Sequence, residues 1–244
     1  MKYFLFFRTI PKAVNLTLFV SFSTLCIKIV WLNAIPAPFE WMVSFGMIME
    51  AILASVIASY VFYLFVVHYP EHQKRKVVIP VIAPLCQRIG NYSYHITNHI
   101  YREADLPLLS ELQVWCPTKV NIKQLEVSLK VIRMKCYDGS TSSQENKRLF
   151  FSYITGDTEK VNNDIEEVLG FINNLVMDTE LTKSLLTLRS SRFRGTMMSI
   201  VEHGKYMGLD EGVAELFDAY NNECIKIYEI GKKLESLYGV STRI

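Results

Sequence analysis

The sequence predicts a mainly α-helical protein, in which an N-terminal transmembrane helical hairpin precedes a mostly helical cytosolic domain. Half of the 244 residues are hydrophobic, and the mean hydropathy is +0.17. Residues 1–76 carry seven basic and three acidic side chains, whereas residues 77–244 carry 19 and 21. An apolar, basic part joined to an ordinary, faintly acidic part indicates a membrane anchor with a soluble domain. This composition excludes disordered, collagen-like and disulfide-stapled chains.

Two apolar segments near the N-terminus have the length of membrane spans. The first covers residues 13–32 and is interrupted by polar side chains, while the second covers residues 41–69 and is more apolar. About 20 residues cross a bilayer core, so the second span should tilt or extend past the interface. Pro36 and Pro38 end the first helix and predict a short external turn at 33–40.

The first segment could instead be a signal peptide that is cleaved after Ala37, because it has a basic start and a stretch of small residues. Pro38, directly after that position, argues against cleavage. Lys28 inside the apolar stretch argues against it as well. The hairpin is therefore the favoured interpretation.

Basic residues predict the direction of the hairpin. They flank both spans on one side, and the connector has none: Lys2, Arg8 and Lys12 come before the first span, and Lys74, Arg75 and Lys76 follow the second. The positive-inside rule then places both termini in the cytoplasm. The second group could also hold anionic lipid headgroups. The expected order is a basic tail at 1–12, spans at 13–32 and 41–69 around the turn at 33–40, a basic flank at 70–76 and a cytosolic domain at 77–244.

One carboxylate is unusual because it lies within a predicted span. Glu50 follows Trp41 by nine residues, which places it about 13 Å below the outer interface. An acid at this depth is a functional hypothesis by default. Gly46, Glu50, Ala54 and Ala58 recur every four residues, and small residues at this spacing permit close helix approach. We therefore expect Glu50 to lie in a helix-association stripe rather than toward lipid.

Two interpretations of this stripe remain open. It could pack the hairpin itself, with a protonated and hydrogen-bonded Glu50. Alternatively, several hairpins could meet so that their Glu50 side chains line a polar path through the membrane. Lys28 lies three residues from Trp31, so it could either snorkel outward or pair with Glu50.

The cytosolic part reads mostly as helix. Pro80 and Pro84 predict that regular helix begins only after Ala83. Within residues 119–136, the apolar residues at 125, 127, 129 and 131 recur with a period of two, as in a strand, yet Lys, Gln and Glu suit a helix, so helix and strand both stay open. The composition of residues 138–146 predicts a loop. Further helices are expected after a cap at Asp157 or Thr158, over about 181–203, and after a cap at Asp210.

The chain shows no nucleotide-binding, hydrolase or zinc motif, so neither an enzyme nor a cofactor is expected. His95, His99 and Glu103 share a helix face and could hold zinc or iron. This spacing is common by chance, and no metal site is predicted from it. Five cysteines form no CxxC pair and are expected to be buried thiols.

A cluster of arginines offers a second candidate contact. Arg189, Arg192 and Arg194 surround Phe193, and such a group could grip phosphates and stack a base. A solvated helix face with a buried Phe193 explains the same residues. The acidic balance of the domain favours the second interpretation.

The layout resembles the small two-span effectors of bacterial anti-phage systems, especially the membrane effectors encoded beside retron reverse transcriptases. The resemblance is carried by the hairpin at 13–32 and 41–69, its basic inner flanks, and a helical cytosolic domain without catalytic motifs. It implies a toxin of the bacterial inner membrane that acts in abortive infection. Such a toxin is held inactive by a protein or nucleoprotein complex, such as a reverse transcriptase with its nucleic acid, until it is released.

We therefore expect a membrane-disrupting effector that forms homo-oligomers in the lipid bilayer and depolarises it. The alternative is a non-enzymatic membrane-anchored adaptor, whose helical domain recruits protein or nucleoprotein partners.

Overall fold

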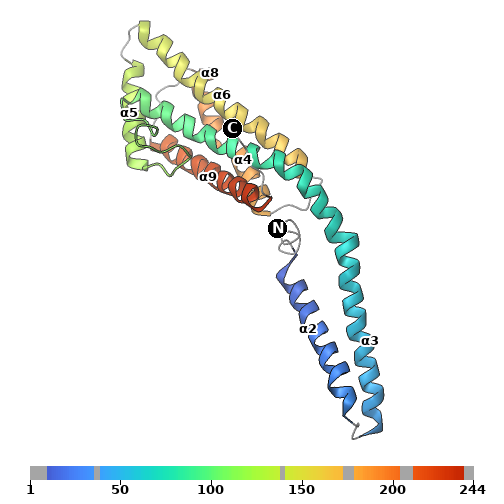
Figure 1. The fold of residues 1–244 in the computed structure, drawn as a ribbon. Helices are drawn as coiled ribbons and strands as arrows, with labels where there is room; N and C mark the ends of the chain where they lie inside the picture. The colour runs from blue at the N-terminus through green and yellow to red at the C-terminus, as the bar shows by residue number, and fades with distance from the viewer. Residues whose placement is uncertain (1–9, 36–38, 138–140, 173–178, 204–210, 239–244) are drawn as a thin grey trace. The chain divides into compact units, whose positions relative to one another are not determined.

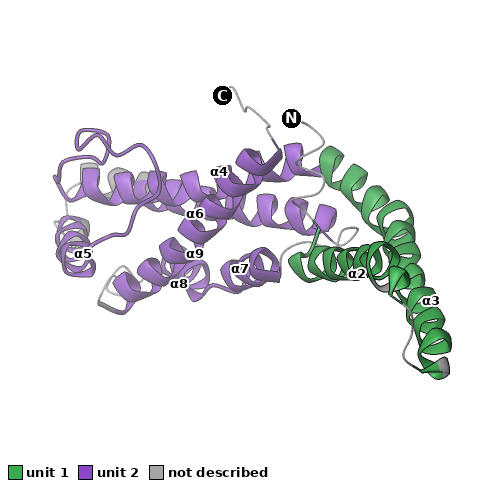
Figure 2. Cartoon of the chain, turned by 60° about the horizontal axis from the view of Figure 1, so that its bottom comes forward, with its two compact units in different colours: residues 1–77 green, residues 78–244 purple. Residues whose placement is uncertain are grey.

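A computed structural model describes residues 10–35, 39–137, 141–172, 179–203 and 211–238. Over these residues the chain is mainly helical and contains no strand, which confirms the mainly α-helical part of the predicted fold class. It divides into two compact units, residues 1–77 and residues 78–244 (Figure 2). The expected division after residue 76 lies one residue earlier.

The first unit contains two apolar helices, each long and apolar enough to cross a membrane. Helix α2 and helix α3 lie side by side and are joined by a short connection that includes the 3₁₀ turn η1 (Figure 1). The second apolar helix does not stop at residue 69. It continues through a π-helical segment, η2, directly into α4. The bounds are α2 Lys12–Val30, η1 Leu32–Ala34, α3 Glu40–Phe62, η2 Tyr63–His68 and α4 Tyr69–Glu103.

Helix α4 corrects the expectation that two prolines delay regular helix until after Ala83. It runs unbroken through Pro80 and Pro84, both of which are partly exposed. Ile79 and Ile82 beside them are fully buried. Burial of these side chains outweighs the cost of the missing backbone donors, as tertiary packing commonly overrides local propensity.

The second unit is a bundle of helices around one hydrophobic core. The later part of α4 contributes to this core along its length, and the core also includes Phe151, Phe193 and Phe217 from three other helices. These side chains bury the apolar stripes that the sequence shows. The further helices are α5 Ile122–Tyr137, α6 Thr141–Ile172, α7 Thr179–Arg189, α8 Arg192–His203 and α9 Glu211–Tyr238.

Helix α5 settles the ambiguous segment at 119–136 as helix from residue 122 onward. Leu125, Leu129 and Ile132 are buried, at the spacing of one helical face. Val127 points outward and is 59% exposed, although it belongs to the alternating pattern. The apparent period of two therefore arises because the exposed Val127 lies between the buried Leu125 and Leu129 in the sequence, and it does not indicate a strand.

Helix α6 begins before the cap expected at Asp157 or Thr158, and its first residues replace part of the loop expected at 138–146. Residues 138–140 lie outside the described residues. Thr158 donates its hydroxyl to the carbonyl of Thr155, and Asp157 binds Lys160 at 3.0 Å. These polar side chains are satisfied within the helix, so they do not have to start it.

The single helix expected over 181–203 is two helices, α7 and α8. Ser190 donates its hydroxyl back to the carbonyls of Leu186 and Thr187 at the end of α7. The hydroxyl of Ser191 accepts from the backbone of Phe193 at 3.3 Å, as an N-cap does at the start of α8. The two serines therefore end one helix and begin the next. The cap expected at Asp210 lies outside the described residues.

Two glycines allow α4 and α9 to approach closely. A Cβ on Gly90 would lie 2.6 Å from the Cβ of Tyr228. A Cβ on Gly231 would lie 2.9 Å from the Cβ of Cys86 and 3.0 Å from the carbonyl oxygen of Ala83. Both contacts are closer than side-chain carbons tolerate, so these positions require glycine.

We expect Gly231→Ala to destabilise the second unit by about 1–3 kcal/mol, because the backbone of α4 must shift to admit the methyl group. Gly156→Ala is the matched control, since a Cβ there meets no atom within 4 Å in the middle of α6. The control should gain up to about 1 kcal/mol from helix propensity. Thermal melting of the full chain in detergent measures both changes, and equal effects would contradict the close approach.

Candidate functional site in the hairpin

The two helices of the hairpin meet along a seam with alternating spacings of three and four residues. This is the spacing of helices that pack nearly parallel to each other. Residues outside the seam are mostly exposed, as expected for helices whose outer faces contact lipid. The least exposed positions include Val14, Leu18, Ser21, Leu25 and Lys28 on α2, and Gly46, Glu50, Leu53, Ile57 and Tyr60 on α3.

An ion pair joins the helices within this seam. Lys28 Nζ lies 2.5 Å from Glu50 Oε2, and the Lys28 side chain is only 12% exposed. The Lys28 side chain passes next to Gly46, where a Cβ would lie 3.5 Å from Lys28 Cε, an ordinary van der Waals contact. Lys28 was expected either to snorkel outward or to pair with Glu50, and in the structure it pairs with Glu50. Two opposite charges that would each be costly in hydrocarbon compensate one another.

A second polar contact joins the helices at the other end of the seam. The hydroxyl of Tyr60 donates to Asn15 Oδ1 at 2.9 Å. Sequence reasoning noted Asn15 only as an interruption of the first span and missed Tyr60. The signal that was available is the spacing of Tyr60 from Glu50 and Leu53, which places it on the same face of α3.

The predicted stripe of Gly46, Glu50, Ala54 and Ala58 does not stay on one face. Gly46 and Glu50 face α2, whereas Ala54 and Ala58 are exposed. The reason is geometric, since each step of four residues turns the helix about 40° beyond a full turn. Small side chains cover the outer face of α3 instead: Ala51, Ala54, Ser55, Ala58 and Ser59.

Glu50 lies where the seam meets this outer face. Its side chain is 42% exposed, and the hydrogen bond from Lys28 goes to one of its two oxygens. The Glu50 side chain therefore lies partly in the contact with α2 and partly outside it. In a membrane, a half-exposed carboxylate would be costly unless something polar covered it.

The basic flank that follows the second span stands next to two buried histidines. Arg75 Nη2 lies 3.8 Å from Glu71 Oε2, and Lys74 and Lys76 are exposed. His68 and His72 stack with ring centroids 6.3 Å apart. Burial lowers the pKa of His72, and the charge of Lys76 lowers it further. Sequence reasoning did not single out these histidines, because a pair at i, i+4 carries no specific signal.

The structure does not support a metal site at His95, His99 and Glu103. The described residues contain no group of three potential ligands that could hold a metal ion. His95 is exposed, while His99 stacks on Tyr153 with centroids 4.7 Å apart. Arg102 Nη2 lies 2.8 Å from His99 Nδ1, and a guanidinium can only donate, so this nitrogen accepts and is unprotonated.

His99 should make the second unit sensitive to acid. Burial lowers its pKa from the ordinary value of about 6.5, and the charge of Arg102 lowers it further. Below about pH 6.5, the His99 imidazole of the unfolded chain takes up a proton, whereas burial in the folded unit disfavours the protonated form. The free energy of unfolding therefore falls as the pH drops below about 6.5. We expect His99→Gln to reduce this loss in melting curves recorded between pH 7 and pH 5. His95→Gln removes an exposed imidazole whose charge is the smallest of the causes that lower the pKa of His99, so it should leave most of the acid sensitivity in place. Equal profiles for the wild type and H99Q would contradict the assignment.

The arginine cluster has the structural explanation that the sequence favoured. Phe193 is 1% exposed, so it cannot stack on a base. Arg189 Nε lies 2.8 Å from Glu166 Oε1, while Arg192 is exposed and Arg194 half-buried. The three arginines thus lie on two helices, at the end of α7 and the start of α8, around one buried aromatic ring.

The cysteines divide between the two environments. Cys86 and Cys224 are buried, and burial raises the pKa of the Cys86 thiol to about 12. Both are therefore inert thiols. Cys26 is exposed on α2 and Cys116 is half-buried, which corrects the expectation that all the thiols are buried. The side chain of Cys136 lies outside the described residues.

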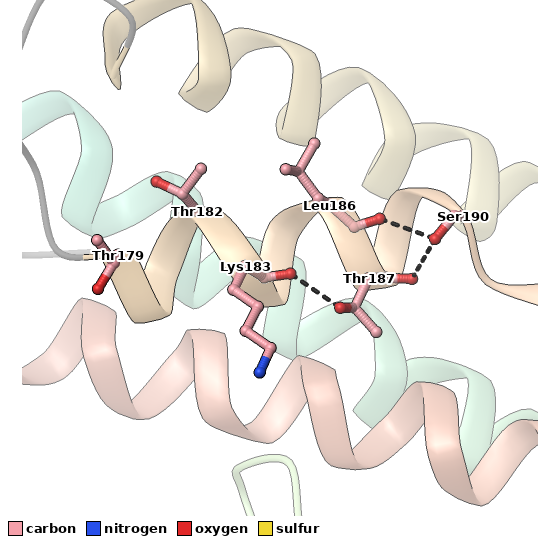
Figure 3. A pocket seen from close by; sticks show the side chains of 6 residues that line it. All are labelled: Thr179, Thr182, Lys183, Leu186, Thr187 and Ser190. Atoms are coloured by element: carbon pink, nitrogen blue, oxygen red, sulfur yellow. Dashed lines mark hydrogen bonds between the residues drawn. The ribbon is translucent and has the colours of Figure 1, made fainter.

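A surface depression on α7 offers no convergent chemistry. All six residues that line it come from this one helix, between Thr179 and Ser190 (Figure 3). Thr187 donates its hydroxyl to the carbonyl of Lys183, and Ser190 donates to Leu186 and Thr187. These two hydroxyls are used within the helix, and the remaining polar groups come from the same helix, so no second element brings side chains to converge on a ligand.

Comparison with protein-family models, with curated proteins and with solved structures finds no match to this chain.

Proposed function

We propose that this chain is a non-enzymatic, membrane-disrupting effector whose hairpins associate and breach the bilayer along a path that includes Glu50. The observation that carries the proposal is the half-exposed carboxylate at the edge of the seam, beside the exposed Ala54 and Ala58. Small side chains let a second helix approach closely, and such an approach would cover Glu50. Intramembrane acids commonly mark ion pathways.

In this proposal, Lys28 pairs with Glu50 and holds it within its own hairpin at rest. Association of several hairpins brings their Glu50 carboxylates together on a shared polar path. The ends of the chain face the cytoplasm, in agreement with the basic residues at 2–12 and 74–76.

The cytosolic helices are proposed to bind an inhibitory protein or nucleoprotein complex. A role in bacterial anti-phage defence, with a retron reverse transcriptase and its nucleic acid as the inhibitor, rests on the resemblance of layout. Loss of the complex would then release the hairpins in the inner membrane.

Replacement of the hairpin tests this function. Residues 10–69 are exchanged for an unrelated two-span hairpin with the same orientation, and bacterial growth is measured after induction. We expect the exchange to abolish growth arrest while the chain stays in the membrane. Retained growth arrest at equal expression would contradict an effector that works through its hairpin.

A membrane-anchored adaptor is the second candidate, and one observation favours it. Lys28 pairs with Glu50 and Tyr60 with Asn15, so these polar groups of the hairpin already have partners within one chain. A hairpin of this kind can serve as an anchor alone. An adaptor should keep its activity after the hairpin exchange.

A further inference from the structure

One part of the second unit concentrates exposed apolar and basic side chains. It comprises residues 112–135, which include α5 and the end of the connection before it, and we name it the basic-apolar surface. It holds five of the nine exposed large hydrophobic side chains that the structure describes between residues 78 and 244. These five are Leu112, Trp115, Ile122, Val127 and Met134.

The charge of this surface is opposite to that of its surroundings. Residues 112–135 contain five basic and one acidic side chain, whereas the rest of 78–244 contains 14 basic and 20 acidic ones. One of the five, Lys135, already binds Asp105 at 2.6 Å, which leaves four basic side chains against one acidic one. Lys119 and Lys123 are both exposed. The occupant of the surface should therefore be anionic.

The helix α5 mixes the two kinds of side chain on its outer face. Lys123, Val127, Lys130 and Met134 follow one another at helical spacing, opposite the buried Leu125 and Leu129. Trp115, in the preceding connection, is 72% exposed. Nucleic acid would use the lysines and the tryptophan but gives no reason for exposed Val127 and Met134.

We propose that the basic-apolar surface binds the anionic headgroup region of a lipid bilayer. Lysines there are attracted to anionic lipid, and Trp, Met and Val enter the boundary between headgroups and acyl chains. Tryptophan is enriched at this depth because its ring is apolar and its N–H is polar. Both kinds of exposed side chain are then covered by one occupant.

The rest of the chain makes this contact accessible. Two apolar helices are long enough to enter a membrane, so lipid is present at high effective concentration. The proposal does not depend on whether the chain is an effector or an adaptor.

Trp115 itself supplies the test, because the chain has only two other tryptophans, Trp31 and Trp41, in the first unit. In the W31F/W41F full chain, all tryptophan emission comes from Trp115. The protein is reconstituted into phosphatidylcholine vesicles, with or without an equal part of phosphatidylglycerol. In anionic vesicles we expect a blue shift, quenching by brominated lipid, and a severalfold loss of quenching by iodide.

Three comparisons make the result specific. Lys119→Gln with Lys123→Gln should abolish the shift, whereas Lys232→Gln with Lys233→Gln, two exposed lysines on α9, should keep it. At 1 M salt the Debye length falls to about 3 Å, so the shift should weaken even with all lysines intact.

Trp115 that stays open to iodide in anionic vesicles would overturn the proposal. So would a shift of equal size in neutral vesicles. A shift that already occurs in detergent and grows with protein concentration would assign the surface to a second copy of this chain instead.

Discussion

Removal of both members of the Lys28–Glu50 ion pair should abolish activity without loss of membrane insertion. We expect the double variant Lys28→Met with Glu50→Gln to reach the membrane in wild-type amounts but to lose growth arrest. The pair is then replaced by two side chains of similar size without charge, so neither charge is stranded in hydrocarbon. Activity is lost because the polar path lacks its carboxylates. Colony counts after induction, with immunoblots of the membrane fraction, measure both quantities.

One single variant of the pair and one control at Tyr60 complete the comparison. Lys28→Met leaves Glu50 unpaired, which costs roughly 2.5–3.5 kcal/mol in hydrocarbon and should reduce the amount of inserted protein. Tyr60→Phe removes the other polar contact of the hairpin and no charge, so it should keep growth arrest. A double variant that is inserted normally and remains fully toxic would show that Glu50 only holds the helices together.

The second large effect is expected at Arg88 in the helical bundle. Arg88 binds Asp164 through two hydrogen bonds, of 2.6 and 2.5 Å, and the Asp164 side chain is only 8% exposed. Arg88→Ala would leave a buried carboxylate without its partner. We expect a loss of about 2–3 kcal/mol, less than for a fully buried pair because Arg88 is half exposed.

Arg189 is a closely matched control, because it is as exposed as Arg88, at 51%, and also binds a carboxylate. Its partner Glu166 is 47% exposed, so water can replace the lost arginine. Arg189→Ala should therefore cost less than about 1 kcal/mol. Melting of the full chain in detergent should separate the two variants by several degrees. Equal shifts would mean that burial of the carboxylate does not set the cost.

Much of the fold was predictable because the apolar residues recur with the period of a helix. The two apolar segments and the buried stripe of α6 through Val161, Ile165 and Val168 follow that rule. Local signals failed where tertiary packing outweighed them. Pro80 and Pro84 lie inside α4 because their neighbours are buried, and α6 continues through Asp157 because Ile154 and Val161 on either side of it are buried.

The candidate site was predictable only in part. The sequence pointed to Glu50, and it offered Lys28 as one of its partners. It could not decide between snorkelling and pairing, because this depends on the side of α2 that faces α3. Gly46 and Ala58 both fit a spacing of four, yet they lie on different faces of α3, because each step of four residues turns the helix beyond a full turn. Tyr60 escaped notice because an aromatic residue near a membrane interface is ordinary.

The central claim is that the hairpin dissipates the membrane potential, and a voltage-sensitive dye tests it most directly. The full chain is expressed alone in bacteria, without any partner to hold it inactive, and dye fluorescence is followed from induction. We predict rapid depolarisation before growth stops, and none with the double variant at Lys28 and Glu50. An unchanged potential while the wild-type chain accumulates in the membrane would contradict the account and leave the adaptor.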